Sequence, residues 1–356
     1  MLTLISFILV LGILIFIHEF GHYITAKAVG IRVEEFALGF GPRLLSYKKG
    51  KTVYSIRGIP LGGFCKMTGE VPPDENMSEK EKEIYEEARE MGECFDQKSP
   101  WKRFAVIFNG PLMNFILAVL FFSLLFIGFG IPEKAVNSNI IGDINPGLPA
   151  AEAGLKIGDK IVRINDIQIK NWEDIDSVIS NSGNKLRIEV IRNGERKIFD
   201  ITPKYIEQFD KFVIGIEGQT VRRYVGLVEG LKLGFLQTWQ TIKLLITGII
   251  GMVTGQVSGD DIAGPVMIAS LVGQAAEIGL KSVMELTALL SINLGLLNLF
   301  PVPALDGGHI LFIFVELIRG KPLNSDKQNL INLIGLAVLL LFMGFVIFKD
   351  LGRILF

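Results

Sequence analysis

The 356-residue chain is poor in several residue types, and each scarcity excludes a class of protein. It has two cysteines and three histidines, and its 36 basic and 37 acidic side chains leave a net charge of −1. Two cysteines cannot build a disulfide scaffold, and Cys65 and Cys94 are not spaced as a zinc-binding pair, so we expect unpaired thiols. The balanced charge implies no strong polyelectrolyte partner, and we expect no binding to nucleic acid.

Long apolar blocks are what the chain does have, since 49% of its residues are hydrophobic. Four blocks are long enough to cross a bilayer, which is typical of a membrane protein: Met1 to about Ala26, Phe104–Pro132, Leu286–Leu305 and Leu330–Phe348. The first resembles a signal-peptide core, but it lacks a basic flank and a small-residue cleavage site, so we expect a retained span. A weaker stretch, Leu244–Gly259, is short and rich in Gly and Thr, which favours an interfacial or re-entrant segment.

Basic residues between the blocks predict the orientation of the chain. They follow the first block, precede the second and separate the last two: Lys27, Arg32, Arg43, Lys98, Lys102, Arg103, Arg319, Lys321 and Lys327. Both of these segments should therefore be cytoplasmic. The long stretch from Glu133 to Lys281 and both termini should lie outside.

A short motif, His18-Glu19-Phe20-Gly21-His22, ends the first apolar block. Two imidazoles four residues apart share one face of a helix, and the glutamate between them can reach a water beside a bound cation. A chance match, or a histidine near lipid headgroups, would be the simpler explanation. However, two of the three histidines fall in this motif, and burying both with a glutamate requires a compensating partner. The motif therefore predicts a metal site at bilayer depth.

Two histidines leave a catalytic zinc one protein ligand short, and Asp306 is the main candidate for that ligand. It ends the third apolar block, in a stretch that two prolines break, where freed backbone groups are tolerated only beside a polar cavity. The orientation above places it near the leaflet that holds His18 and His22. Two alternatives stay open: Asp306 caps a helix, or His309 is the ligand.

Residues 31–67 alternate in polarity and are interrupted by glycine and proline. Ile31–Phe36 and Thr52–Ile56 are predicted strands, with a turn at Lys48–Lys51. The apolar, glycine-rich stretches Gly39–Pro42 and Pro60–Phe64 could dip into the membrane beside the motif and pair with an extended substrate. An ordinary surface hairpin fits the pattern equally. The charged stretch Pro72–Glu93 is expected to be an exposed helix or loop without chemistry.

The segment from Ala135 to about Pro203 has the pattern of a compact soluble domain. A short helix starts within Gly147–Leu155, a turn and strand follow at Gly158–Asn165, and Trp172–Ser180 forms a second helix. Leu186–Ile201 is a predicted hairpin around the two-residue turn Asn193-Gly194. The pattern resembles a bacterial PDZ domain, which binds extended peptides beside a sheet edge. A rigid filter that excludes bulky ectodomains is the alternative.

Taken together, three features resemble the site-2 protease family over essentially the whole chain. They are the HExxH motif, the stretch Asn298–Gly307 (NxxPxPxLDG) and the PDZ-like segment between them. The resemblance is closest to bacterial enzymes of the regulator-of-sigma-E-protease type, although the chain has room for one PDZ domain where some relatives have two. Further segments are similar to the membrane-dipping β-loop, the second-span motif and the segment after the PDZ domain of that family: Gly39–Gly41, Asn109–Asn114 and Ala263–Val266.

The resemblance implies a zinc-dependent intramembrane endopeptidase in the bacterial inner membrane, with its active site toward the cytoplasm. It implies His18, His22 and Asp306 as zinc ligands and Glu19 as the catalytic acid/base. It further implies that the partners are the lipid bilayer and membrane-spanning peptide segments, such as those of anti-sigma factors or remnant signal peptides.

Four more residues are candidates for handling the substrate. Asn298 and Asn114 lie in predicted spans and would donate to the oxyanion or position the substrate, although a span asparagine can equally bond a neighbouring helix. Gly39 and Gly41 belong to the loop that would hold the substrate extended.

The expected fold is a polytopic α-helical membrane protein with about four transmembrane helices, a cytoplasmic-side β-loop and an inserted extracytoplasmic PDZ (α+β) domain. The expected divisions are 1–26 (first span with the motif), 27–103 (cytoplasmic segment with the β-loop at 31–67), 104–132 (second span), 135–204 (PDZ domain), 205–281 (interfacial segment) and 282–350 (third and fourth spans). Two other classes are a PDZ scaffold with a structural metal and a metal or ion transporter. Transporters often have paired broken helices in internal repeats, and we find no such repeats in this sequence.

Overall fold

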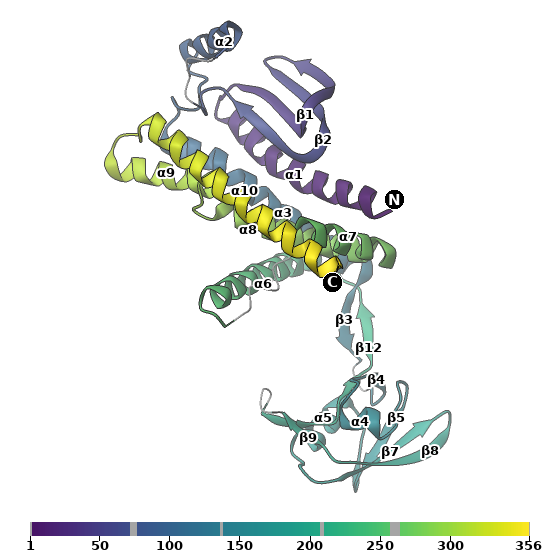
Figure 1. Ribbon diagram of the computed structural model, residues 1–356. Helices are drawn as coiled ribbons and strands as arrows, with labels where there is room; N and C mark the ends of the chain where they lie inside the picture. Colours follow the sequence, from purple (N-terminus) through teal and green to yellow (C-terminus); the bar gives the residue numbers. More distant parts are fainter. Residues whose placement is uncertain (1, 72–76, 136–137, 207–209, 257–263, 356) are drawn as a thin grey trace. The chain divides into compact units, whose positions relative to one another are not determined.

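The computed structural model describes residues 2–71, 77–135, 138–206, 210–256 and 264–355. The chain forms two compact units, which are described separately below (Figure 1). The larger unit comprises Met1–Gly128 and Gly226–Phe356, and the smaller one comprises Phe129–Val225. Parts of the segments predicted above lie outside the described residues, namely Met1, 72–76, 136–137, 207–209 and 257–263.

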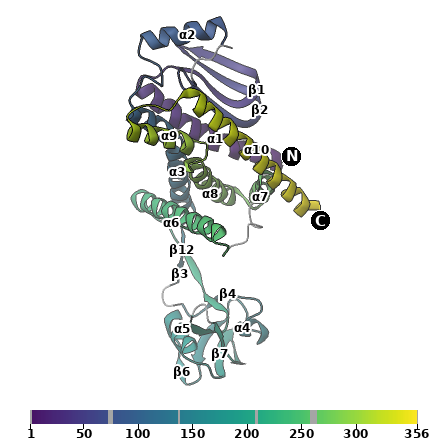
Figure 2. The ribbon, with the colours of Figure 1, turned by 60° about the vertical axis from the view of Figure 1, so that its left-hand side comes forward.

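Four helices of the larger unit are long and apolar enough to cross a membrane, as predicted: α1 (Leu2–Ala28), α3 (Pro100–Phe129), α8 (Leu280–Leu299) and α10 (Ser325–Leu355). Only 11–28% of the residues in their most apolar windows are buried inside the protein. The remaining apolar surface needs lipid around it. Figures 1 and 2 show that α1 starts and α10 finishes at the same end of this unit.

The larger unit has four further described helices: α2 (Glu79–Glu90), α6 (Leu227–Val253), α7 (Pro265–Ile278) and α9 (Asp306–Arg319). Helix α7 packs against α1 and α8, where Val10, Leu14, Leu117 and Val272 form a buried cluster. Helix α9 was not expected as a separate element. Helix α8 ends at Leu299, before Pro301 and Pro303, and α9 begins at Asp306. Asp306 therefore belongs to the start of a new helix and does not end the third predicted span.

Helix α6 is longer than the short apolar segment expected at 244–259. The helix already begins at Leu227, and its charged residues Glu229 and Lys232 hide the apolar pattern of its first half. Gly230 and Gly234 pack so closely on α3 that a Cβ atom would lie 2.5 Å from Ile127 Cγ1 and 2.1 Å from Ser123 Oγ, respectively. These small residues attach α6 to a candidate span.

The predicted β-loop is an antiparallel hairpin of two long strands, β1 (Val33–Lys49) and β2 (Thr52–Met67). Both strands bend, so the first half of β1 lies between the two halves of β2, and Ala37 is opposite both Ser55 and Phe64. The last part of β2 is thereby left as an edge of the sheet within the described residues. That edge lies along α1, because a Cβ atom on Gly63 would be 2.8 Å from Ile15 Cγ2.

The smaller unit has an antiparallel sheet in the order β6 (Ile167–Gln168), β5 (Lys160–Ile164), β7 (Leu186–Arg192) and β8 (Glu195–Ile201). Its core consists of isoleucine, leucine and valine side chains. Its helix α5 (Trp172–Ser180) and the β7–β8 hairpin confirm the predicted elements. Asn193 and Gly194 have φ angles of 55° and 85°, as the predicted two-residue turn requires. Strands β3 (Ile131–Lys134) and β4 (Ile141–Ile144) and helix α4 (Pro149–Glu152) precede this sheet in the chain.

Residues 205–225 belong to this smaller unit and not to the interfacial segment expected at 205–281. They contain β9 (Lys204–Ile206), β10 (Lys211–Val213), β11 (Ile216–Gly218) and β12 (Thr220–Arg223). Strand β11 pairs with β4, and β12 pairs with β3, so the end of the segment returns to its beginning. Strands of three or four residues are too short for periodicity to reveal them.

Candidate metal centre

Three side chains from two distant parts of the sequence converge on one point in the larger unit. His18 and His22 lie on one face of α1, with 3.3 Å between their Nε2 atoms. Oδ2 of Asp306, in the first turn of α9, is 3.2 Å from Nε2 of His18 and 3.5 Å from that of His22. Among the described residues, these three form the one cluster of His, Cys, Asp or Glu able to hold a metal ion.

The spacing of these three atoms fits tetrahedral zinc. Zinc bonds of about 2.0–2.2 Å at tetrahedral angles separate neighbouring ligand atoms by roughly 3.3–3.5 Å. The three observed separations are 3.2, 3.3 and 3.5 Å. Oδ2 of Asp306 is buried and has no hydrogen-bond donor among the described residues. A cation at this point would supply the partner that the carboxylate lacks.

The alternatives for the third ligand can now be compared with the geometry. The cap residue of α9 is Leu305, and no side chain caps the helix, so Asp306 does not have the capping role. His309 lies one turn further along α9 and is not part of the cluster. The converging Asp306 carboxylate is therefore the third candidate ligand.

Helix α3 contacts α1 beside the cluster and orients the His22 ring. Nδ1 of His22 donates to the carbonyl of Val106 at 2.9 Å, which leaves Nε2 free for a metal. Pro111, inside α3, has no N–H to donate to the carbonyl four residues earlier, that of Ile107. Gly21 touches α3 directly, since a Cβ atom there would be 2.3 Å from the Asn109 carbonyl oxygen.

The turn that carries Asp306 is tightly packed and has an unusual backbone. Ala304 has a φ angle of +72°, in the left-handed region that favours glycine. A Cβ atom on Gly307 would lie 2.0 Å from the carbonyl oxygen of Phe300, and one on Gly308 would lie 2.6 Å from that of Val302. The glycines after Asp306 therefore allow α9 to begin directly against the end of α8.

Glu19 lies between the histidines and the edge of the hairpin. Its Cγ atom would be 3.3 Å from a Cβ atom on Gly63, so the side chain lies against the β2 backbone. The predicted acid/base thus lies next to the free strand edge.

The four candidate substrate-handling residues occupy different places. Nδ2 of Asn298 is 3.5 Å from His18 Nε2, on the metal side of the ring, whereas the Asn114 amide is 3.1 Å from Nδ1, on the opposite side. Gly39 and Gly41 lie in the bend of β1, with φ angles of +87° and +81°, and their nearest neighbours are in Arg57 and Ile59.

A polar cavity of about 480 Å³ lies beside the start of α9, a feature that the sequence did not locate. Glu70 and His309 line it, and an ion pair between Arg103 and Glu316 joins α3 to α9 at its wall. Burial raises the pKa of Glu70 to about 7, so this carboxyl can exchange a proton near neutral pH.

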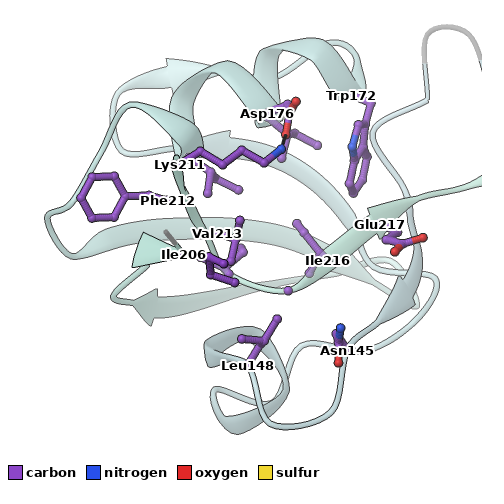
Figure 3. A pocket seen from close by; sticks show the side chains of 14 residues that line it. Asn145, Leu148, Trp172, Asp176, Ile206, Lys211, Phe212, Val213, Ile216 and Glu217 are labelled. Atoms are coloured by element: carbon purple, nitrogen blue, oxygen red, sulfur yellow. Dashed lines mark ion pairs between the residues drawn. The ribbon is translucent and has the colours of Figure 1, made fainter. Parts of the chain in front are cut away.

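A second cavity, of about 300 Å³, lies in the smaller unit between α5 and the β10–β11 segment (Figure 3). Apolar side chains form most of its lining, including Ile175, Ile179, Ile206, Val213, Ile214 and Ile216. Lys211 and Asp176 face each other across its rim, with 3.8 Å between Nζ and Oδ1. The shape and lining suit an apolar side chain of a peptide.

The site defines a class of protein: a metal-dependent hydrolase whose ligands lie on or beside membrane-type helices. The chain belongs to peptidase family M50, whose model matches residues 6–342. It is similar to the regulator of sigma-W protease RasP of Bacillus subtilis, with 34% identity over 99% of both chains. It is 33% identical to the zinc metalloprotease RasP of Geobacillus kaustophilus, over 99% of this chain and 98% of the relative.

This membership confirms the predicted class and cofactor: the protein is a multi-pass membrane zinc metalloprotease. Among solved structures, the PDZ domain of an SdrC-like protein from Listeria monocytogenes matches with 20% identity and a TM-score of 0.22. That match covers 24% of this chain and 92% of the other.

Proposed function

We propose that this zinc metalloprotease cleaves membrane-spanning segments of single-pass proteins, as in regulated intramembrane proteolysis. The observation that carries the proposal is the convergence of His18, His22 and Asp306 beside helices long enough to cross a bilayer. Anti-sigma factors and remnant signal peptides are the substrate classes we favour. The name of the Bacillus subtilis relative, a regulator of sigma-W protease, agrees with the first of these.

His18, His22 and Asp306 hold the zinc in this proposal, and Glu19 is the general base. Zinc bound there supplies a Lewis acid that activates water and polarises the scissile carbonyl. The Glu19 carboxylate accepts a proton from the attacking water and returns it to the leaving amine nitrogen. The side-chain amide of Asn298, on the metal side of His18, is placed to donate to the developing oxyanion.

The substrate lies along the free edge of β2 in our proposal. A membrane helix must unwind before attack, because its carbonyls are held by N–H groups four residues away. Residues 63–67 of β2 lie beside Glu19 and offer backbone groups to an extended segment. Gly39 and Gly41 permit the bend of β1 that keeps this sheet compact.

The hairpin is proposed to sit in the cytoplasmic leaflet. Side chains of its bent outer part are apolar and exposed, and they include Phe40, Leu44, Leu45, Ile56 and Ile59. An ordinary surface hairpin would leave these side chains in water. Contact with lipid removes them from water and places the edge of β2 at membrane depth.

Single-cysteine labelling tests the orientation that the basic residues predict. Both natural cysteines are buried, so Cys65→Ser and Cys94→Ser give a background for Lys48→Cys in the hairpin and Lys197→Cys in the smaller unit. We expect a membrane-impermeant maleimide added to intact cells to label the second site and not the first. Labelling of the first site would reverse the proposed topology.

The smaller unit is proposed to be a PDZ-type domain that takes an extended peptide in its apolar cavity. In that case Val213→Asp should slow cleavage of substrates with long outer tails, because a carboxylate in the cavity opposes an apolar side chain. A pure size filter predicts a different result. The variant would then cleave normally, while fusion of a bulky ectodomain to the substrate would block both proteins.

Cleavage by purified, zinc-loaded full-length protein tests the proposed function. Single-pass model segments are incubated with wild type, with Glu19→Gln and with Glu86→Gln, which makes the same change at an exposed position on α2. We expect Glu19→Gln to keep its zinc and to lose cleavage at least about 100-fold, because proton transfer is lost. The proposal would be contradicted if the wild type cleaved water-soluble peptides but no membrane segment, or if Glu19→Gln kept full activity.

A further inference from the structure

Asn114 is a buried polar residue on the side of His18 that faces away from the candidate metal position. Its side-chain amide is 3.1 Å from Nδ1 of His18, whereas Nε2 of the same ring faces Asp306 and His22. Asn114 is fully buried, and its backbone carbonyl accepts a hydrogen bond from Ser291 on α8 at 2.7 Å. The amide is thus fixed against one ring nitrogen by packing from two helices.

Metal binding imposes a condition on that ring nitrogen. A neutral imidazole carries one proton, so a ring that offers the Nε2 lone pair to a metal must carry its proton on Nδ1. A buried N–H without an acceptor destabilises the structure that contains it. His22 meets the condition through the carbonyl of Val106. His18 needs an acceptor of its own, and the Asn114 side chain is the group at hydrogen-bonding distance.

The oxygen of the Asn114 amide meets this condition if the amide is turned around. In the structure, Nδ2 faces the His18 ring, and Oδ1 is buried without a hydrogen-bond donor among the described residues. The two ends of the amide exchange places by a half-turn about the last side-chain bond. That half-turn brings Oδ1 against Nδ1–H and gives the oxygen the donor that it lacks.

We propose that Asn114 is a positioning residue that sets the tautomer of His18. Its amide oxygen accepts the Nδ1 proton and holds the Nε2 lone pair toward the metal. Helix α3 then orients both histidines of α1, His18 through the Asn114 side chain and His22 through the Val106 carbonyl. This role replaces the one expected from sequence, in which Asn114 donated to the oxyanion. The inference rests on the proposed metal site but not on the proposed substrate.

Zinc affinity of the full-length protein is the first test, measured by competition with a chromogenic chelator. Asn114→Leu keeps the approximate size and removes the acceptor, while Asn114→Asp keeps an acceptor oxygen. Ser123→Ala, which removes another buried polar group from α3, is the matched control. We expect a loss of about 10–100-fold for Asn114→Leu, as for other residues that orient metal ligands, and near wild-type affinity for the other two.

Nitrogen and proton NMR of zinc-loaded protein labelled with ¹⁵N-histidine is the second test, and the three histidines keep the spectrum simple. With zinc on Nε2, we expect the Nδ1 proton of His18 to resonate at the low field of a hydrogen-bonded N–H in wild type and in Asn114→Asp. In Asn114→Leu we expect this His18 signal to move to higher field while the Nδ1 proton of His22 keeps its position, which also shows that the variant is folded. An Nδ1 proton of His18 without a hydrogen-bond shift in wild type, or wild-type zinc affinity in Asn114→Leu, would overturn the inference.

These readouts separate the inference from the proposed function. If zinc affinity and the NMR signals behave as expected and no membrane segment is cleaved, the substrate assignment fails and the role of Asn114 stands. If Asp306→Ala and Asn114→Leu both bind zinc as tightly as wild type, the metal site itself is wrong and the inference falls with it.

Discussion

Nε2 of His22 lies directly against the backbone of Gly110, where a Cβ atom would be only 2.2 Å away. Only glycine at position 110 leaves the imidazole in its place, because every other residue would put a carbon atom inside its contact distance. The ring cannot move without breaking its hydrogen bond to Val106 or losing its alignment with His18 and Asp306. One residue without a side chain on α3 therefore determines whether the candidate metal ligands on α1 can converge.

Gly110→Ala should displace the His22 ring and lower both zinc occupancy and proteolytic activity. A displacement of about 1 Å costs roughly 100-fold in rate when reacting groups are held in fixed geometry. Zinc content after dialysis, together with the cleavage rate, measures the effect. Gly128→Ala is the matched control on the same helix, because nothing lies within 4 Å of its added Cβ atom. Equal zinc content in the two variants would show that the contact at Gly110 is unimportant.

Ala304→Gly should stabilise the protein, because Ala304 has a φ angle of +72°. The left-handed conformation costs a non-glycine residue about 1–2 kcal/mol, part of which is offset by the extra freedom of glycine in the unfolded chain. We expect a net gain of up to about 1 kcal/mol in the free energy of unfolding, with zinc binding retained. Ala288→Gly, in the middle of α8, should instead destabilise by about 1 kcal/mol. Thermal unfolding of both variants in the same lipid or detergent provides the comparison.

Local periodicity accounts for the parts of this structure that the sequence could predict. The spacing of His18 and His22 follows from helix geometry, and the apolar blocks follow from the thickness of a bilayer. The choice of Asp306 relied on its position at the end of a block and on the orientation from basic residues. None of these inferences required knowledge of a tertiary contact within the chain.

The unpredicted parts depend on tertiary contacts that leave no periodic signal. The fit of Gly110 against His22, and the position of Asn114 at Nδ1 of His18, require the packing of α1 on α3. Residues 205–225 were misplaced because their strands are short and pair with β3 and β4, far away in the sequence. The start of α6 was missed because Glu229 and Lys232 interrupt an apolar pattern whose buried face consists of small residues.

The hairpin should lose stability in acid because of Glu35. Burial by itself would raise the pKa of this carboxyl, but hydrogen bonds from Arg43, Ser55 and Arg57 outweigh burial and lower the pKa to about 2. A carboxyl with a lowered pKa stabilises the folded state above its unfolded pKa, near 4.5, and this contribution is lost as the pH falls toward 2. The contribution is on the order of 3 kcal/mol.

Glu35→Gln should therefore lower the stability of the hairpin at neutral pH. It should also remove the pH dependence of that stability between pH 4.5 and 2. Hydrogen exchange of the β1–β2 amides, corrected for the intrinsic rate at each pH, measures both effects. Glu83→Gln, at an exposed position on α2, should behave as wild type. A wild-type hairpin whose protection does not change over this pH range would show that the Glu35 cluster contributes little.

Zinc K-edge absorption of the full-length protein, combined with metal stoichiometry, tests the central claim most directly. We predict one zinc per chain with two imidazole nitrogens and a carboxylate oxygen at about 2.0–2.2 Å, and no sulfur ligand. In Asp306→Ala the carboxylate contribution should disappear and zinc should be lost on dialysis, whereas Glu19→Gln should retain a wild-type spectrum. A spectrum that shows sulfur, or that is unchanged in Asp306→Ala, would contradict a centre formed by His18, His22 and Asp306.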